Sequence, residues 1–408
     1  MTTCADLATD PSLAAHAGAS APRVAFRCVG TTTPADTIAL LRTLVGFDTT
    51  SRHSNLTLVD WVVAYLESHG GRVRLTHSDA GDKANLLASF GPAVPGGVVL
   101  SAHTDVVPAE RADWQSDPFV LTERDGRLCG RGVADMEGFI AACLAAVPSW
   151  SRAKLRRPIH LALSYDEEVG CLGVPRLLDD LVAHVPMPAL AIVGEPTEWR
   201  VGVAHRGFFG YRTRFQGRAA HSSDPAAGIS AIAPAADFVR FLLAQQKVQA
   251  PAPATTTFNI GRIEGGTAIN TVPDRCEVIW EFRPGMMADV GTIRAKVGAF
   301  LATAIPPEVR TQQVELAGVP PLAAGPAQPA ARLACACGGI GPAIALGFGT
   351  EAGFFQNAGI PAVVCGPGSI TQAHHVDEWI ARDQLTAADD FLRRLVMWAQ
   401  AEDAARLP

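Results

Sequence analysis

The sequence lacks any apolar run that could cross a membrane without a charged or turn-forming residue. It also lacks blocks of like charge, because 34 basic and 40 acidic residues are spread along the chain to a formal charge of −6. No basic surface for nucleic acid or anionic lipid is therefore expected. Internal repeats and heptad arrays are absent too. These absences exclude a membrane protein and a nucleic-acid-binding protein, and they leave small molecules as the expected partners.

Cysteine gives no sign of a disulfide framework or a thiolate zinc site. The nine cysteines are odd in number and show no CxxC spacing, and Cys335 and Cys337 stand too close for a zinc knuckle. We interpret them as reduced thiols, mostly core residues, in a cytoplasmic protein. Residues 1–33 contain no apolar run of signal-peptide length, so we expect a flexible N-terminal extension there.

At 408 residues the chain exceeds what one hydrophobic core usually supports, which predicts two or three domains, and we expect two. Apolar residues make up 48% of the chain, which is enough to fill a core. Short apolar runs at residues 98–102, 159–164 and 189–193 alternate with helical stretches such as 138–147 and 174–184. This alternation predicts an α/β domain with a mostly parallel mixed sheet flanked by helices.

The pattern changes in the middle of the chain, where alternating strands and amphipathic helices follow one another. The expected strands are 207–215, 256–263 and 276–282, and the expected helices are 230–244 and 290–304. This order predicts an inserted α+β domain of the βαββαβ, ferredoxin-like type at residues 205–315. Residues 34–204 and 316–408 would form the α/β domain.

Five motifs with histidine or acidic residues follow predicted strands of the α/β part, where open parallel sheets place their sites. In the first, His103 is a candidate metal ligand, and Asp105 is expected to accept its other imidazole N–H. In the second, Asp135 precedes an apolar helix, and a helix N-cap is the alternative interpretation.

The third motif places Asp166, Glu167 and Glu168 directly after an apolar strand, which is electrostatically costly without a cation. One glutamate can bind metal while the other takes a proton from water. A solvated acidic turn is the alternative. The fourth motif offers Glu195, otherwise a helix-start carboxylate, and the fifth offers His374. Two histidines and three carboxylates suit zinc, cobalt or manganese.

Over residues 35–400 the order and flanks of these motifs resemble the M20 metallopeptidase family and, within it, the acetylornithine deacetylase group. The resemblance implies two divalent metal ions, zinc first, with cobalt or manganese as alternatives. It implies that His103, Asp135 and Glu195 hold one ion. Asp135, Glu168 and His374 would hold the other, so that Asp135 bridges the pair.

By the same resemblance Glu167 is the general base, which takes a proton from water that the ions acidify and returns it to the leaving amine. The Asp135–Met136 peptide is expected to be cis. The sequence departs from the family at Glu137, where a lysine is usual. This reversal of charge near the metals puts the exact substrate in doubt.

The inserted domain resembles the family's lid and dimerisation domain, which implies a homodimer formed through residues 205–315. There His221 would stabilise the oxyanion, reaching in from a second subunit. Asn270 and Arg283 would bind the substrate, since a guanidinium pairs well with an α-carboxylate. Glu351 would meet a cationic amine. The alternatives are a surface histidine, a turn asparagine and a surface arginine.

The leading hypothesis is a metal-dependent amidohydrolase that converts the small molecule N2-acetyl-L-ornithine to L-ornithine and acetate, as in arginine biosynthesis. Related hydrolases are the alternatives: succinyl-diaminopimelate desuccinylase, acetylcitrulline deacetylase, aminoacylase or dipeptidase. The distant alternative is a non-catalytic binding protein with the same fold. Such a protein could lose a metal ligand or the general base, but this sequence retains all of these residues.

Overall fold

The computed structural model describes residues 36–246, 255–325 and 327–402, so the extension expected at residues 1–33 lies outside the described residues. The helices are α1 (Thr37–Val45), α2 (Leu56–Ser68), α3 (Glu137–Arg152), α4 (Val174–His184), α5 (Ile232–Ala244), α6 (Met287–Thr303), α7 (Gln328–Cys337), α8 (Ala352–Asn357) and α9 (Arg382–Gln400). The strands are β1 (Arg72–His77), β2 (Ala84–Phe90), β3 (Val98–His103), β4 (Thr122–Arg124), β5 (Arg127–Cys129), β6 (Ile159–Ser164), β7 (Leu190–Val193), β8 (Arg200–His205), β9 (Phe208–Gln216), β10 (Ala220–His221), β11 (Thr257–Gly265), β12 (Thr271–Val272), β13 (Arg275–Arg283), β14 (Arg310–Val319), β15 (Ile340–Leu346), β16 (Ala362–Val364) and β17 (Trp379–Ala381).

An eight-stranded sheet with the order β1-β2-β6-β3-β7-β16-β8-β15 forms the larger part of the fold. Its central strands β6, β3 and β7 run parallel to one another. Every residue of these three strands is buried, because helices cover both faces of the sheet. Continuous apolar runs, rather than alternating ones, are what such doubly covered strands require.

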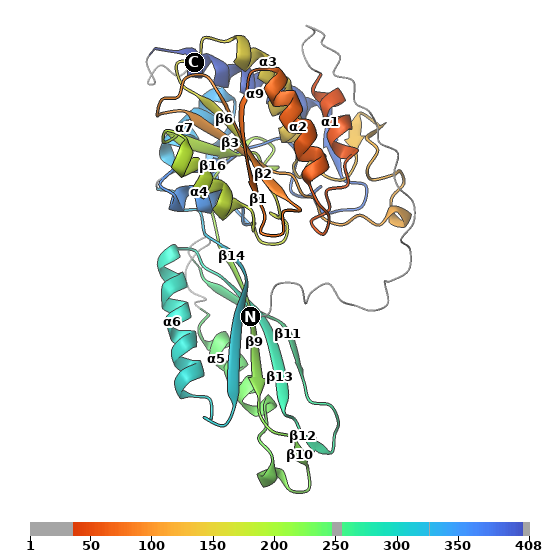
Figure 1. Ribbon diagram of the computed structural model, residues 1–408, viewed down its shortest axis with the longest axis vertical. Helices are drawn as coiled ribbons and strands as arrows, with labels where there is room; N and C mark the ends of the chain where they lie inside the picture. Colours follow the sequence, from red (N-terminus) through yellow and green to blue (C-terminus); the bar gives the residue numbers. More distant parts are fainter. Residues whose placement is uncertain (1–35, 247–254, 326, 403–408) are drawn as a thin grey trace. The chain divides into compact units, whose positions relative to one another are not determined.

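Helices lie on both sides of this sheet (Figure 1). The buried apolar residues form two cores, one on each face. Residues of α1, α2, α3, α7 and α9 contribute to one core, and residues of α4 and α8 contribute to the other. The helix α3 is buried over most of its surface. Its Trp150 packs edge-on against Phe90 of β2, with ring centroids 5.5 Å apart. This contact packs the C-terminal end of α3 against the sheet.

A four-stranded sheet has the order β11-β13-β9-β14, and all of its pairs are antiparallel. Buried residues alternate along β13, so that one face of this sheet is covered. The helices α5 and α6 lie beside this sheet (Figure 1). Their apolar residues contribute to the core on the covered face, which includes Phe238 and Trp280. The predicted class, a mixed α/β sheet flanked by helices plus an antiparallel α+β part, is confirmed. The domain boundaries at residues 205 and 315 stay a prediction.

Several strands were not expected from the sequence, and β2 is the clearest case. It is buried at all seven residues and pairs antiparallel with both β1 and β6. Its segment contains Asn85 and Ser89 and no β-branched residue, so its local preference for a strand is weak. Its place in the sheet therefore comes from its neighbours.

The described cysteines are all free, which agrees with their interpretation as reduced thiols. Among them Cys335 is exposed and the others are buried. Across the described ranges, no helix is both long enough and apolar enough to traverse a lipid bilayer.

Candidate metal centre

The three central parallel strands end at one edge of the sheet, and each delivers a candidate ligand there. His103 is the last residue of β3. Glu167 and Glu168 follow the end of β6, and Glu195 follows the end of β7. Because parallel neighbours share the position of their carboxyl ends, residues separated by almost a hundred positions meet at this edge.

Asp135 lies between two imidazoles. Its Oδ1 atom is 3.0 Å from Nε2 of His103, and its Oδ2 atom is 3.2 Å from Nε2 of His374. Each imidazole has a second carboxylate beside it: Oε2 of Glu168 lies 3.0 Å from Nε2 of His374, and Oε1 of Glu195 lies 3.9 Å from Nε2 of His103. The arrangement is therefore two sets of donors that share one carboxylate.

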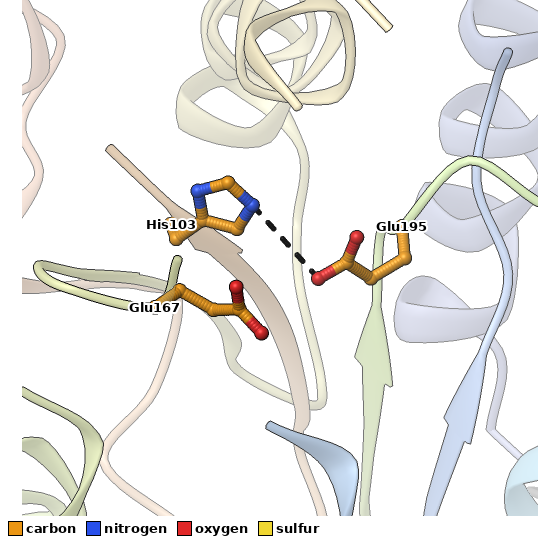
Figure 2. Close-up of side chains that lie close together, drawn as sticks. All are labelled: His103, Glu167 and Glu195. Atoms are coloured by element: carbon orange, nitrogen blue, oxygen red, sulfur yellow. Dashed lines mark ion pairs between the residues drawn. The ribbon is translucent and has the colours of Figure 1, made fainter. Parts of the chain in front are cut away.

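The donor atoms are close enough to share cations. One ligand atom from each of His103, Glu167 and Glu195 lies within 4.8 Å of the others, and the same holds for His103, Asp135 and Glu168. Figure 2 shows the carboxylates of Glu167 and Glu195 on the same side of the His103 ring. Nitrogen and oxygen donors of this mix fit a divalent ion such as zinc, cobalt or manganese.

Burial makes this cluster of carboxylates unfavourable unless positive charge offsets it. The side chains of Asp135, Glu168 and Glu195 are only 6%, 7% and 5% exposed. Burial and the nearby Asp135 raise the pKa of Glu195 well above its usual range, and the same two causes raise the pKa of Glu168 to about 7. Burial also raises the pKa of Glu167. The cluster attracts cations.

The pKa values of the two imidazoles are raised as well, which for histidine favours the charged form. Hydrogen bonds to Asp135 and Glu168 raise the pKa of His374 to about 10. Burial opposes protonation of His103, but Asp135 and Glu195 raise its pKa well above 6.5. Burial also opposes ionisation of Asp135, yet its hydrogen bonds to the two histidines hold its pKa below the usual range. The carboxylates and the imidazoles in contact thus favour each other's charged forms.

The N-cap interpretation of Asp135 is wrong. Met136 is the N-cap residue of α3, while the side chain of Asp135 points to the histidines. The Asp135–Met136 peptide bond is cis, which confirms the expectation.

The expected contact of Asp105 with His103 needs a correction. The main-chain oxygen of Asp105, 2.8 Å from Nδ1 of His103, is its hydrogen-bond acceptor, while the carboxylate lies 3.7 Å away. That carboxylate instead accepts the main-chain N–H groups of Glu167 and Glu168, at 3.0 and 3.2 Å, and the hydroxyl of Ser51 at 2.7 Å. Asp105 therefore orients the segment that carries both glutamates.

The match to known proteins accords with this geometry. Residues 99–398 match Peptidase family M20/M25/M40. The chain belongs to this family. It is 32% identical over 371 residues to a protein named acetylornithine deacetylase from Pasteurella multocida, covering 87% of this chain and 94% of that protein. This M20 chain is thus a hydrolase of a metal-dependent family.

Two solved structures share the M20 fold at lower identity. A tripeptidase from Staphylococcus aureus aligns with a TM-score of 0.70 at 20% identity, covering 90% of this chain and 98% of that one. A dinuclear metal binding peptidase of the M20 family from Bacillus subtilis aligns with a TM-score of 0.61 at 17% identity, covering 88% and 96%. These likenesses concern the fold.

The candidate substrate residues of the M20 chain do not all meet the metal cluster. His221 is exposed on β10, which pairs with β12, and the main-chain oxygen of its neighbour Asn270 accepts the N–H of Ser222 at 2.9 Å. These two candidates therefore lie near each other. Arg283 ends β13, where its Nε donates to Glu281 at 3.0 Å and its guanidinium lies over Phe208.

Glu351 lies in a different environment from the one expected. Its side chain is 1% exposed, and its carboxylate accepts hydrogen bonds from the hydroxyls of Ser101, at 2.8 Å, and Ser164. Both oxygens are therefore hydrogen-bonded inside the protein, one to a serine of β3 and the other to a serine of β6. A contact of Glu351 with a substrate amine stays a prediction, and it would require these hydrogen bonds to be exchanged.

Two further buried glutamates, Glu137 and Glu378, lie beside the cluster, and their surroundings were not predicted from the sequence. Glu137 is 1% exposed, and its Oε2 atom has no hydrogen-bond partner among the described residues. Burial first, and then the nearby Glu378, raise its pKa well above the usual range. Glu378 was overlooked, although it stands four residues after His374. A carboxylate that binds main-chain N–H groups leaves no pattern in the sequence.

Proposed function

We propose that the chain hydrolyses the amide bond of N-acyl amino acids with two divalent metal ions at this centre. The observation that carries the proposal is the position of Asp135, whose two carboxylate oxygens face His103 and His374 separately. Glu195 would complete one set of ligands and Glu168 the other. A carboxylate shared between two sets is the arrangement that a pair of neighbouring ions requires.

The ions and the neighbouring Glu167 would have different roles in the hydrolysis. When bound, the ions would polarise the amide carbonyl and make water a better acid. Glu167 would accept the proton of the attacking water and give it to the leaving amine. Its main-chain N–H is bound by Asp105, and Cys171 donates to its Oε1 atom at 3.4 Å. These two contacts fix the glutamate while leaving its second carboxylate oxygen available.

Substrate contacts would come from the residues of the antiparallel part. His221 would donate a hydrogen bond to the oxyanion, and Asn270 beside it would orient the substrate. Arg283 would pair with the α-carboxylate of the amino acid after leaving Glu281. We also propose that the chain acts as a homodimer through residues 205–315. The edge strand β11, with its exposed Ile263, supports this.

N2-acetyl-L-ornithine is the substrate we propose first, because the relatives at about 32% identity are named acetylornithine deacetylase. A step in arginine biosynthesis in the cytoplasm would follow from this substrate. The internal position of Glu351 leaves the partner of the ornithine amine unassigned, and it favours testing neutral substrates as well. Succinyl-diaminopimelate, acetylcitrulline, other N-acyl amino acids and dipeptides are the alternatives.

A substrate panel with defined metal content tests the proposal. Protein stripped by a chelator would be reloaded with zinc or with cobalt and assayed for release of free amine from each compound. We expect turnover only after reloading, with acetylornithine giving the largest kcat/KM. Activity that survives complete metal removal would refute the dinuclear mechanism, and a larger kcat/KM for a dipeptide would refute the deacetylase assignment. Light scattering of the same samples measures the oligomeric state.

A further inference from the structure

Glu378 is a buried residue whose carboxylate accepts its hydrogen bonds from a single loop. Its side chain is 1% exposed. The Oε1 atom accepts the main-chain N–H groups of Ala134 and Asp135, at 2.8 and 3.1 Å. The Oε2 atom accepts the N–H of Gly132 at 3.0 Å and Nη1 of Arg131 at 2.7 Å. Both oxygens are thus occupied, which leaves Glu378 no free position as a metal ligand.

The loop that Glu378 holds is the one that presents Asp135. Its Gly132 has a φ of +81°, and a Cβ atom there would lie 2.7 Å from a methyl group of Val106. The loop therefore adopts a conformation that few sequences reach. In it the main-chain N–H groups of Gly132, Ala134 and Asp135 point toward Glu378, whereas that of Val133 donates to the main-chain oxygen of Gly130. A single anion facing these N–H groups stabilises that conformation.

The adjoining strands keep Glu378 opposite this loop. β17 begins one residue after Glu378 and pairs antiparallel with β5, which ends just before the loop. The main-chain oxygen of Glu378 also accepts the N–H of Gly130 at 3.0 Å. The segment that delivers His374 is therefore tied through Glu378 to the segment that delivers Asp135.

We propose that Glu378 is a positioning residue, which holds Asp135 between His103 and His374 and thereby sets the affinity of the centre for divalent ions. The inference rests on the proposed function, because it assigns Asp135 as the shared ligand. Charge-assisted hydrogen bonds to main-chain N–H groups are stronger and shorter than neutral ones, so a carboxylate restricts this loop more than an amide does.

The test is the substitution Glu378→Gln, measured by equilibrium dialysis of the metal-free protein against zinc and against cobalt. The amide would turn its NH2 group toward donors and leave some of them unpaired. We expect the affinity for the ions to fall about 10- to 100-fold, with an altered cobalt absorption spectrum. We expect kcat to fall as well, with KM changed less than about threefold.

Asp389→Asn is the matched control, since this carboxylate accepts the hydroxyl of Thr37 at 2.7 Å in another part of the fold. It should leave ion affinity unchanged. If Glu378→Gln does not fold, Glu378→Asp replaces it, and about a tenfold loss of ion affinity is then expected. Unchanged affinity in the folded variant, even with a lower melting temperature, would overturn the inference alone. Wild-type protein that binds no divalent ion would overturn the proposed function and this inference together.

Discussion

The imidazole of His103 and the carboxylate of Asp135 lie 3.0 Å apart, although 32 residues separate them in the chain. The strand β3 fixes the first residue, and the loop before α3 fixes the second. On the far side of Asp135 stands His374, which is 51% exposed, whereas His103 is 1% exposed. The two halves of the centre thus differ in their access to solvent.

We predict from this difference that a chelator removes the two ions in sequence. The ion at His374 and Glu168 should leave first, because solvent and chelator reach that side. Elemental analysis of protein sampled during chelation should show a stage with about one ion per chain. His374→Ala should bind one ion from the start. Loss of both ions in a single phase would contradict the prediction.

Glu167→Gln should reduce kcat by roughly 10²- to 10⁴-fold, the usual contribution of a general base, while both ions are retained. The amide keeps the size of the side chain but cannot accept a proton. Steady-state kinetics and metal analysis on the same sample measure the two effects. The exposed Glu67→Gln on α2 is the control and should behave as wild type. Turnover that stays unchanged in the Glu167 variant would refute the assignment.

Asp105→Asn should lower kcat about 10- to 100-fold, because the carboxylate binds the main-chain N–H groups of Glu167 and Glu168. Ser51→Ala removes only the hydroxyl that donates to the same carboxylate. That variant should therefore change kcat by less than about threefold. Equal effects of the two substitutions in kinetic assays would mean that Asp105 does not act through the two glutamates.

Acid should destabilise the fold in part through His160, a buried side chain of β6. Burial lowers its pKa from 6.5 to about 4. The unfolded chain binds this proton first as the pH falls, so the contribution of His160 to stability is present above pH 6.5 and is lost between 6.5 and about 4. The loss amounts to roughly 3 kcal/mol.

His160→Asn removes this titration and should flatten the pH dependence of stability in that window. Urea unfolding of metal-free protein at several pH values gives the free energies of unfolding. Because the metal ligands also titrate, the quantity to compare is the difference between wild type and variant. The assigned pKa shift would be contradicted if the difference in unfolding free energy between wild type and variant were the same at pH 7 and at pH 4.

Gly194→Ala should destabilise the protein by about 1 to 3 kcal/mol, as overpacking of a core does. An added Cβ atom would lie 2.1 Å from the ring of Phe139, which is completely buried in α3. Gly298→Ala on the exposed side of α6 is the control, because no atom lies within 4 Å of its Cβ position. That control should gain about 0.5 to 1 kcal/mol. Thermal and urea unfolding measure both, and an unaffected Gly194 variant would mean that the close packing there is relieved cheaply.

The sequence by itself determined the central strands and the candidate ligands. Apolar runs such as residues 159–164 can be buried on both faces, and acidic or histidine residues directly after them must lie at the carboxyl edge of the sheet. This information is local, so it can be read from one segment at a time. The strand β2 escaped detection because its own residues prefer a strand only weakly, and its partners β1 and β6 impose its conformation.

The tertiary structure alone decided which atoms the polar side chains face. A sequence names a carboxylate but not its donors, since those come from segments far along the chain. Hence the carboxylate of Asp105 binds main-chain N–H groups, while its main-chain oxygen binds His103. Glu351 lies inside the protein with Ser101 and Ser164. Glu378 binds the loop of Asp135 for the same reason. Burial and hydrogen bonding depend on what packs over a residue, and only the assembled fold supplies that.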